Sequence, residues 1–179
     1  MNGKKQVAVV TGAARGIGLA ITRKFLASGD AVALLDIDAT TLATTTASLA
    51  APDEVLSIVC DVSQPAEVQA AIAQVDRRFG RLDALVNNAG TTKIAFNHAD
   101  LGALSAADFQ HVYGVNVIGA FQMIRAVEPA MRKQGSGTVV NVSSIAAVMG
   151  IGTSVAYAAS KGALNTMTLS LARALGPQI

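Results

Sequence analysis

The stretch Thr11-Gly12-Ala13-Ala14-Arg15-Gly16-Ile17-Gly18 decides the fold of this chain. An apolar run, Gln6–Val10, leads into it, and apolar residues at helical spacing (Ile17, Ile21 and Phe25) follow. A glycine-rich turn between a strand and a helix lets the backbone approach a pyrophosphate, to which the helix N-terminus offers free N–H groups. The spacing Gly-x-x-x-Gly-x-Gly is neither the common dinucleotide fingerprint nor a P-loop. Alone, the turn is equally compatible with any tight strand-to-helix connection.

Apolar runs of strand length alternate with helical patterns along the whole chain. Strands are predicted at Gln6–Val10, Ala31–Asp36, Glu54–Asp61, Leu82–Asn87 and Thr138–Val142. Strands that are apolar nearly throughout are typical of a parallel sheet covered on both faces. The sequence therefore predicts one α/β domain over residues 1–179, a doubly wound parallel sheet of the Rossmann type between two layers of helices.

Capping patterns and glycines mark the helix boundaries. Ser63 with Pro65 predicts the start of one helix, and Ser105 with Asp108 forms a capping-box pattern at another. Glycines are expected to end three helices, at Gly29, Gly80 and Gly176.

Composition argues against several classes of function. Charged residues make up 15% of the chain and the net charge is +2, with basic residues scattered in pairs, which does not favour a nucleic-acid surface. No run approaches the ~18 apolar residues of a membrane span. Cys60 is the single cysteine and is expected to be a buried structural thiol in a reducing compartment. We expect a cytoplasmic protein without a metal, because His98 and His111 lack partners at metal-ligand spacing.

A carboxylate at the end of the second predicted strand strengthens the nucleotide hypothesis. Asp36 lies about 20 residues beyond the glycines, where a carboxylate can hydrogen-bond the adenosine ribose of a dinucleotide. It would repel a 2′-phosphate, and the next residue is Ile37 rather than Arg. NAD is therefore expected over NADP, although Arg15 would offset part of the repulsion. The alternative is that Asp36 only caps a loop.

Six motifs occur in one order along the chain, and together they resemble the short-chain dehydrogenase/reductase family. They are the Thr11–Gly18 turn, Asp61-Val62, Asn87-Asn88-Ala89-Gly90, Asn116, Ser143-Ser144 and Tyr157-Ala158-Ala159-Ser160-Lys161. The resemblance covers essentially the whole chain. The pattern is most similar to 3-oxoacyl-acyl-carrier-protein reductases and to sugar or polyol dehydrogenases. The first of these branches generally prefers NADPH, which Asp36 does not favour.

The resemblance implies four catalytic residues, Asn116, Ser144, Tyr157 and Lys161. Tyr157 and Lys161 stand four residues apart, so on a helix they share one face. The phenol of free tyrosine has a pKa near ~10, and a neighbouring ammonium and a positive nicotinamide ring stabilise its phenolate. Tyr157 would therefore exchange a proton with the substrate oxygen, which Ser144 would hydrogen-bond. Asn116 would hold a water that relays protons to Lys161.

The resemblance also implies a cofactor site. Lys161 would hold the nicotinamide ribose, and Asp61 with Val62 would contact the adenine. Asn87 is expected to brace the fold rather than touch the cofactor. The residues expected to bind the dinucleotide are Gly12, Arg15, Gly16, Ile17, Gly18, Asp36, Asp61, Val62, Asn88, Ala89, Gly90, Tyr157 and Lys161.

These observations predict an oxidoreductase that moves a hydride between NAD and a small secondary alcohol or ketone. The chain ends at Ile179, where family members continue through further strands and a segment that closes over the substrate, so we expect a C-terminal truncation. A nucleotide-binding module without turnover is the alternative. The stretch Thr91–Leu104 is expected to border the substrate pocket, but nothing in it names a ligand.

A homodimer or homotetramer is expected by the same resemblance. The family packs two helices against those of a neighbouring subunit, and here they correspond to Ala106–Gln134 and Ser154–Leu175. Small residues and methionines suited to close packing on them are Met123, Ala126, Ala163 and Met167.

Overall fold

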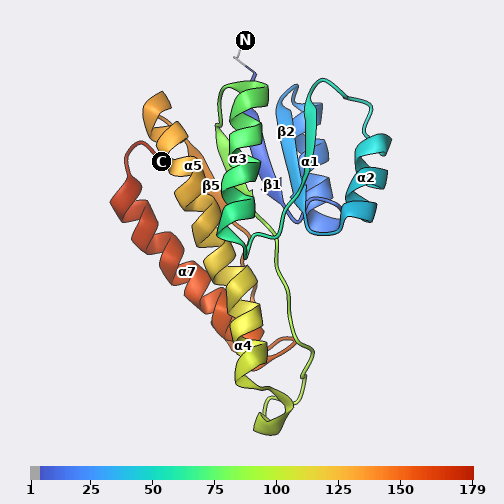
Figure 1. The fold of residues 1–179 in the computed structure, drawn as a ribbon. Coiled ribbons are helices and arrows are strands. Elements are labelled where there is room, and N and C mark those ends of the chain that lie inside the picture. The colour runs from blue at the N-terminus through green and yellow to red at the C-terminus, as the bar shows by residue number, and fades with distance from the viewer. Residues whose placement is uncertain (1–4) are drawn as a thin grey trace.

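The computed structural model describes residues 5–179, which form a parallel sheet between two layers of helices (Figure 1). The strands are β1 (Val7–Thr11), β2 (Ala31–Asp36), β3 (Val55–Val59), β4 (Ala84–Asn87) and β5 (Thr138–Asn141). They lie in the order β3-β2-β1-β4-β5, and every neighbouring pair is parallel. The chain builds one half of the sheet outward from β1 and then crosses to β4. Such a reversal of strand order opens a crevice beyond the carboxyl ends of the strands. The predicted doubly wound α/β fold is confirmed.

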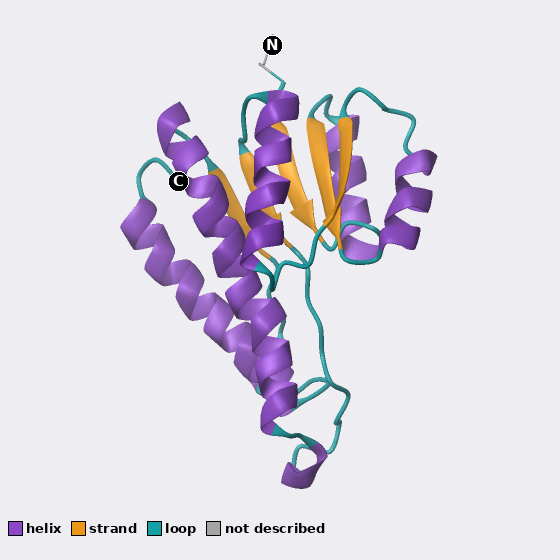
Figure 2. Ribbon diagram, viewed as in Figure 1, coloured by secondary structure: helices purple, strands orange, loops and turns teal. Residues whose placement is uncertain are grey.

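Helices cover both faces of the sheet because the side chains of each strand point alternately to either face. Helices α1 (Gly16–Ala27) and α2 (Ala39–Ser48) cover one face, while α3 (Pro65–Phe79), α5 (Ala120–Gln134) and α7 (Val155–Leu175) cover the other (Figure 2). Along β1, Val7 and Val9 pack in the core with α3 and α5, whereas Val10 packs in the core with α2. Along residues 5–179, no helix combines the length and apolarity needed to cross a membrane.

One continuous helix runs past the carboxyl ends of the strands and carries part of the site (Figure 1). It consists of α4 (Ala106–Tyr113), a π-helical segment (Gly114–Gly119) and α5. The predicted bounds Ala106–Gln134 are correct, and the capping box of Ser105 and Asp108 is present. The π-helical segment was not predicted, because a single wider turn hardly disturbs the apolar spacing. Two further short helices are Leu101–Ala103 and α6 (Ala146–Met149).

The remaining differences from the predicted elements concern boundaries and one missed helix. Helix α2 was not predicted, since its sequence is rich in threonine, which has a low helix propensity, and only Leu42 and Thr45 on it are buried. Ser63 does not cap α3: the N-cap is Gln64, followed by Pro65 at the first turn. The predicted strands differ from the observed ones by up to two residues at their ends, and Ala31–Asp36 is identical. Of the three glycines, Gly80 ends its helix in the left-handed region, Gly29 follows the C-cap Ser28, and Gly176 is extended.

Candidate active site

The glycine turn between β1 and α1 brings the chain very close to the loop after β4. Gly12 and Gly16 have φ of 62° and 57°, a left-handed conformation that favours glycine. A Cβ on Gly12 would lie 2.9 Å from Ala89 Cα, and one on Gly18 would collide with the Gly12 carbonyl. A Cβ on Gly16 would meet nothing within 4 Å, so this glycine faces open space. The turn therefore packs tightly on one side and leaves the N-terminus of α1 open to a ligand.

Thr11 and Asn88 hold this turn against the β4 loop. The Thr11 hydroxyl oxygen accepts hydrogen bonds from the backbone N–H groups of Asn88 and Ala89, both at 3.0 Å. The Asn88 side-chain amide donates to the carbonyl oxygens of Thr11 and Gly12, also at 3.0 Å. The sequence alone does not indicate this role of Thr11, because a hydroxyl at a strand end has no distinctive sequence signal. It positions residues that border the cavity described below.

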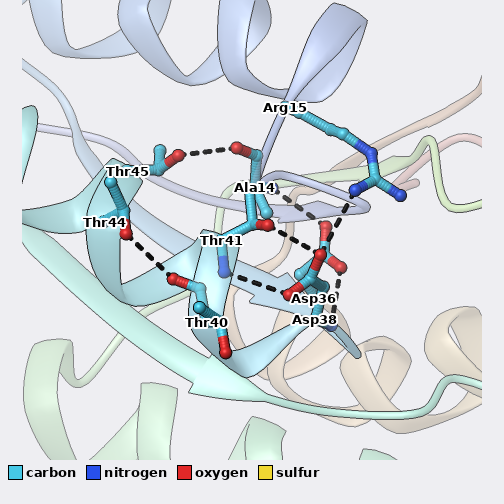
Figure 3. Close-up of polar contacts among 8 residues, drawn as sticks. All are labelled: Ala14, Arg15, Asp36, Asp38, Thr40, Thr41, Thr44 and Thr45. Carbon is cyan, nitrogen blue, oxygen red and sulfur yellow. Dashed lines mark hydrogen bonds and ion pairs between the residues drawn. The ribbon is translucent and has the colours of Figure 1, made fainter.

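Asp36 braces the same turn from the end of β2 (Figure 3). One carboxylate oxygen accepts the N–H of Ala14 at 2.9 Å, and the other accepts the N–H of Asp38 at 3.0 Å. From α2, the Thr45 hydroxyl donates to the Ala14 carbonyl at 2.6 Å. A carboxylate offers about four acceptor positions, so Asp36 can stabilise the loop and still accept ribose hydroxyls. The two interpretations of Asp36 are therefore compatible.

A cavity of about 380 Å³ lies beyond the carboxyl ends of the strands, between the glycine turn and α4. It is lined by eight of the residues predicted to bind a dinucleotide: Gly12, Arg15, Asp36, Asp61, Val62, Asn88, Ala89 and Gly90. Gly16, Ile17 and Gly18 lie in the first turn of α1, outside this lining. The wall also includes Thr91, the first residue of the stretch expected to border the substrate pocket. His111 and Val115 also line it and have no signal in the sequence, because the helix that carries them reaches the cavity only through the tertiary fold. Carboxylates, an arginine, backbone groups and apolar surface together fit the adenosine and phosphate portion of a dinucleotide.

Tyr157 and Lys161 share one face of α7. The helix begins after Ser154, whose hydroxyl oxygen accepts the Tyr157 N–H at 3.2 Å. The Lys161 ammonium nitrogen lies 5.8 Å from the centroid of the Tyr157 ring. Lys161 is only 4% exposed and donates to the Val142 carbonyl at 2.8 Å. Burial lowers the pKa of Lys161, because the charged ammonium is poorly solvated there. A buried cation thus lies beside the phenol ring.

Asn116 links α7 to the loop after β4. It is buried in the π-helical segment, and its amide group donates to the Ser160 hydroxyl at 2.9 Å and to the Thr91 carbonyl at 3.0 Å. Its carbonyl oxygen accepts the Thr91 N–H at 2.8 Å. The Ser160 hydroxyl in turn donates to the Tyr157 carbonyl at 2.7 Å. Ser160, a residue of the Tyr157–Lys161 motif for which the resemblance implies no role, therefore connects Asn116 to the helical turn that carries Tyr157.

The two serines after β5 have different surroundings. The Ser143 hydroxyl donates to the Lys161 carbonyl at 3.5 Å, which ties this loop to α7. The Ser144 hydroxyl oxygen accepts the Ala146 N–H at 3.2 Å, so its own O–H can still be donated to a ligand. The predicted structural role of Asn87 is also visible, since its amide donates to Asn141 at 2.9 Å and joins β4 to β5.

Cys60 lines the cavity but is not suited to be a nucleophile. It is 2% exposed, and burial, with Glu67 and Asp61 nearby, raises the pKa of its thiol to about 11. The thiol is therefore protonated at neutral pH, as expected for a structural cysteine. Within residues 5–179, no three His, Cys, Asp or Glu side chains are grouped to hold a metal ion.

Comparisons with known proteins agree with this geometry. A family model described as short chain dehydrogenase matches residues 6–179. The 2-(R)-hydroxypropyl-CoM dehydrogenase of Xanthobacter autotrophicus is 44% identical, over 93% of this chain and 67% of that protein. The D-threitol dehydrogenase of Mycolicibacterium smegmatis is 38% identical, over 87% of this chain and 59% of that protein. The chain thus spans about two thirds of the length of such relatives.

Two solved structures bound to NAD are also similar. A short chain dehydrogenase/reductase from Burkholderia phymatum in complex with NAD is 35% identical, with a TM-score of 0.89 over 98% of this chain and 63% of that one. NAD⁺-bound xylitol dehydrogenase is 37% identical, with a TM-score of 0.90 over 97% of this chain and 66% of that one. The chain belongs to the short-chain dehydrogenase family, and the predicted oxidoreductase class is confirmed.

Proposed function

We propose that the protein transfers a hydride between NAD(H) and a small secondary alcohol or ketone, with Tyr157 as the acid–base group. The observation that carries this proposal is the buried Lys161 ammonium, 5.8 Å from the centroid of the Tyr157 ring. Lys161 lies one helical turn from Tyr157 on the same face of α7, so its ammonium is placed to act on the group that exchanges the proton. An ordinary packing tyrosine needs no buried cation beside it.

The residues around the cavity fit a nicotinamide dinucleotide. The N-terminus of α1 and the open space at Gly16 would receive the pyrophosphate, and Asp36 would accept the adenosine ribose hydroxyls. Asp61 and Val62 would contact the adenine. Lys161 lies outside the lining of the cavity, but its ammonium nitrogen is 3.7 Å from where a Cβ on Gly90 would lie, and it would donate to the nicotinamide ribose. When bound, the nicotinamide ring supplies or accepts the hydride. The two NAD-bound relatives and the Asp36 carboxylate support NAD over NADP.

The protein's own groups handle the proton and orient the substrate. The Ser144 hydroxyl donates to the substrate oxygen and holds it near Tyr157. The Tyr157 phenol gives its proton to that oxygen during reduction, or its phenolate takes the proton during oxidation. Lys161 stabilises the phenolate, while Asn116 fixes the loop at Thr91 and, through Ser160, the helical turn of Tyr157. Asn116 would also position the water that returns protons to Lys161.

A turnover assay with a binding assay separates this proposal from the alternative of a nucleotide-binding module. The protein is incubated with NAD⁺ and a panel of secondary alcohols, and with NADH and the matching ketones, while NADH absorbance is followed. We expect cofactor binding by NADH fluorescence together with turnover of at least one panel member. Binding of NADH without turnover across alcohols, polyols and hydroxyacyl thioesters would support the binding module instead.

A further inference from the structure

An ion pair connects the residues that precede two helices, next to Asp36 at the end of β2 (Figure 3). Arg15 is the N-cap of α1 and Asp38 is the N-cap of α2. The Arg15 guanidinium nitrogen Nη1 lies 3.2 Å from Asp38 Oδ2, although the Arg15 side chain is 75% exposed. Arg15 is the one lysine or arginine among the described residues that line the cavity. Asp38 therefore holds the guanidinium charge of the cavity wall in the position that the structure shows.

Asp38 is fixed more firmly than a usual surface carboxylate. Its Oδ1 accepts the Thr41 N–H at 3.0 Å, and its Oδ2 accepts the Thr41 hydroxyl at 2.7 Å. Its backbone N–H donates to Asp36 Oδ1 at 3.0 Å, which couples the two acids. The Thr41 hydrogen bonds, followed by the Arg15 charge, lower the pKa of the Asp38 carboxyl. A fixed, ionised acceptor thus faces Arg15 before any ligand binds.

We propose that Asp38 is a second determinant of cofactor choice, which holds Arg15 on itself and away from a 2′-phosphate. The inference rests on the NAD preference proposed above. An NADP molecule would bring about two negative charges to a region that already holds the carboxylates of Asp36 and Asp38. Among the described residues that line the cavity, the one lysine or arginine that could compensate them is Arg15, which is already paired with Asp38. An NAD molecule carries no 2′-phosphate and leaves the Arg15–Asp38 pair intact. The pair would therefore penalise NADP selectively.

The substitution Asp38→Asn removes the charge and retains the helix cap, because asparagine caps helices about as well as aspartate. The readout is the ratio of the dissociation constants for NADP⁺ and NAD⁺, measured by calorimetry. Adenosine 2′,5′-bisphosphate and 5′-AMP repeat the comparison without a nicotinamide ring or turnover. We expect Asp38→Asn to lower the ratio of the dissociation constants by at least about fivefold, both for NADP⁺ over NAD⁺ and for adenosine 2′,5′-bisphosphate over 5′-AMP.

A second substitution identifies Arg15 as the residue that is released. In the double variant Arg15→Gln with Asp38→Asn, most of the gain for the phosphorylated ligands should disappear. Asp53→Asn serves as the control for a general loss of negative charge, since Asp53 is an exposed acid in the turn before β3. Asp38→Ser provides another capping residue without a charge and should behave like Asp38→Asn.

The outcomes separate this inference from the proposed cofactor preference. A wild-type protein that binds NADP⁺ as well as NAD⁺ would overturn both. A wild-type protein that prefers NAD⁺, with ratios unchanged in Asp38→Asn and Asp38→Ser, would overturn only the role of Asp38. A gain that persists after Arg15 is also replaced would show that Asp38 acts by its own charge, and it would overturn the proposed restraint of Arg15.

Discussion

The hydroxyl of Tyr157 can be removed without disturbing the packing of its ring. In Tyr157→Phe the aromatic contact with Lys161 persists, so cofactor affinity should be unchanged. Turnover should fall by at least ~10²–10⁴-fold, which is the usual contribution of a general acid–base group. Steady-state kinetics and NADH fluorescence titration measure the two effects separately. Tyr113→Phe, at the other tyrosine of the chain, is the control and should keep wild-type turnover. Near-normal activity in Tyr157→Phe would refute the mechanism.

The raised pKa of Cys60 predicts an alkaline loss of stability. Its thiol has an ordinary pKa of 9.0 and a folded-state pKa of about 11, so the stabilisation is complete below pH 9.0 and is lost as the pH rises toward about 11. Between these two pH values the unfolded chain releases a proton that the folded chain retains. The free energy of unfolding therefore falls by about 2–3 kcal/mol. Urea unfolding at several pH values should show a shallower alkaline decline in Cys60→Ala than in wild type. Equal slopes for the two proteins would contradict the assignment.

At the scale of single elements, α2 has a function that its sequence does not reveal. Its buried Thr45 donates a 2.6 Å hydrogen bond to the Ala14 carbonyl and so connects this helix to the glycine turn. Thr45→Ala should leave that carbonyl without this donor and lower the free energy of unfolding by about 1–3 kcal/mol. Thr44→Ala removes a neighbouring exposed hydroxyl that bonds only within the helix, and it should change stability by no more than about 0.5 kcal/mol. Thermal denaturation measures the change in the free energy of unfolding for each variant. Equal changes in Thr45→Ala and Thr44→Ala would contradict a stabilising role for the hydrogen bond from Thr45 to Ala14.

Sequence reasoning succeeded for elements whose signal is local. The buried strands are nearly continuous apolar runs, and the spacing from Tyr157 to Lys161 is one helical turn, so both could be predicted from neighbouring residues. It failed where tertiary contacts decide the structure. Helix α2 forms although its threonines disfavour helix, since Leu42 packs into the core and Asp38 caps its start. The π-helical turn at Asn116 likewise depends on partners in the β4 loop and in α7.

The cavity itself is a property of the whole molecule. Its walls come from the carboxyl ends of β1, β2, β3 and β4, from α4 and from the π-helical segment, which are far apart in the sequence. The motif glycines and acids could be placed there from the sequence because carboxyl ends of parallel strands share one edge of the sheet. His111 and Val115 could not be placed in the cavity from the sequence, because no local signal indicates that the continuous helix carrying them extends beyond that edge of the sheet (Figure 1). The sequence therefore predicts the sheet-derived part of the site better than the helix-derived part.

The helices expected to form the subunit interface retain exposed apolar side chains. Phe121 on α5 is 42% exposed and Leu169 on α7 is 61% exposed. Met123, expected in the core or at the interface, is fully buried in the core of its own chain and is therefore not an interface residue. Ala126, Ala163 and Met167 are half-buried and remain candidates. We therefore propose a homo-oligomer that buries Phe121 and Leu169.

Light scattering coupled to gel filtration tests this assembly. The wild-type protein should elute as a dimer or tetramer at micromolar concentration. Leu169→Glu should weaken the association by at least about tenfold, because a carboxylate would be moved from water into an apolar contact. Leu101→Glu changes a leucine that is more exposed than Leu169, in a short helix outside α5 and α7, so it should leave the oligomer intact. A monomeric wild type would exclude the interface, and dissociation by Leu101→Glu rather than Leu169→Glu would place it at the loop before α4 instead.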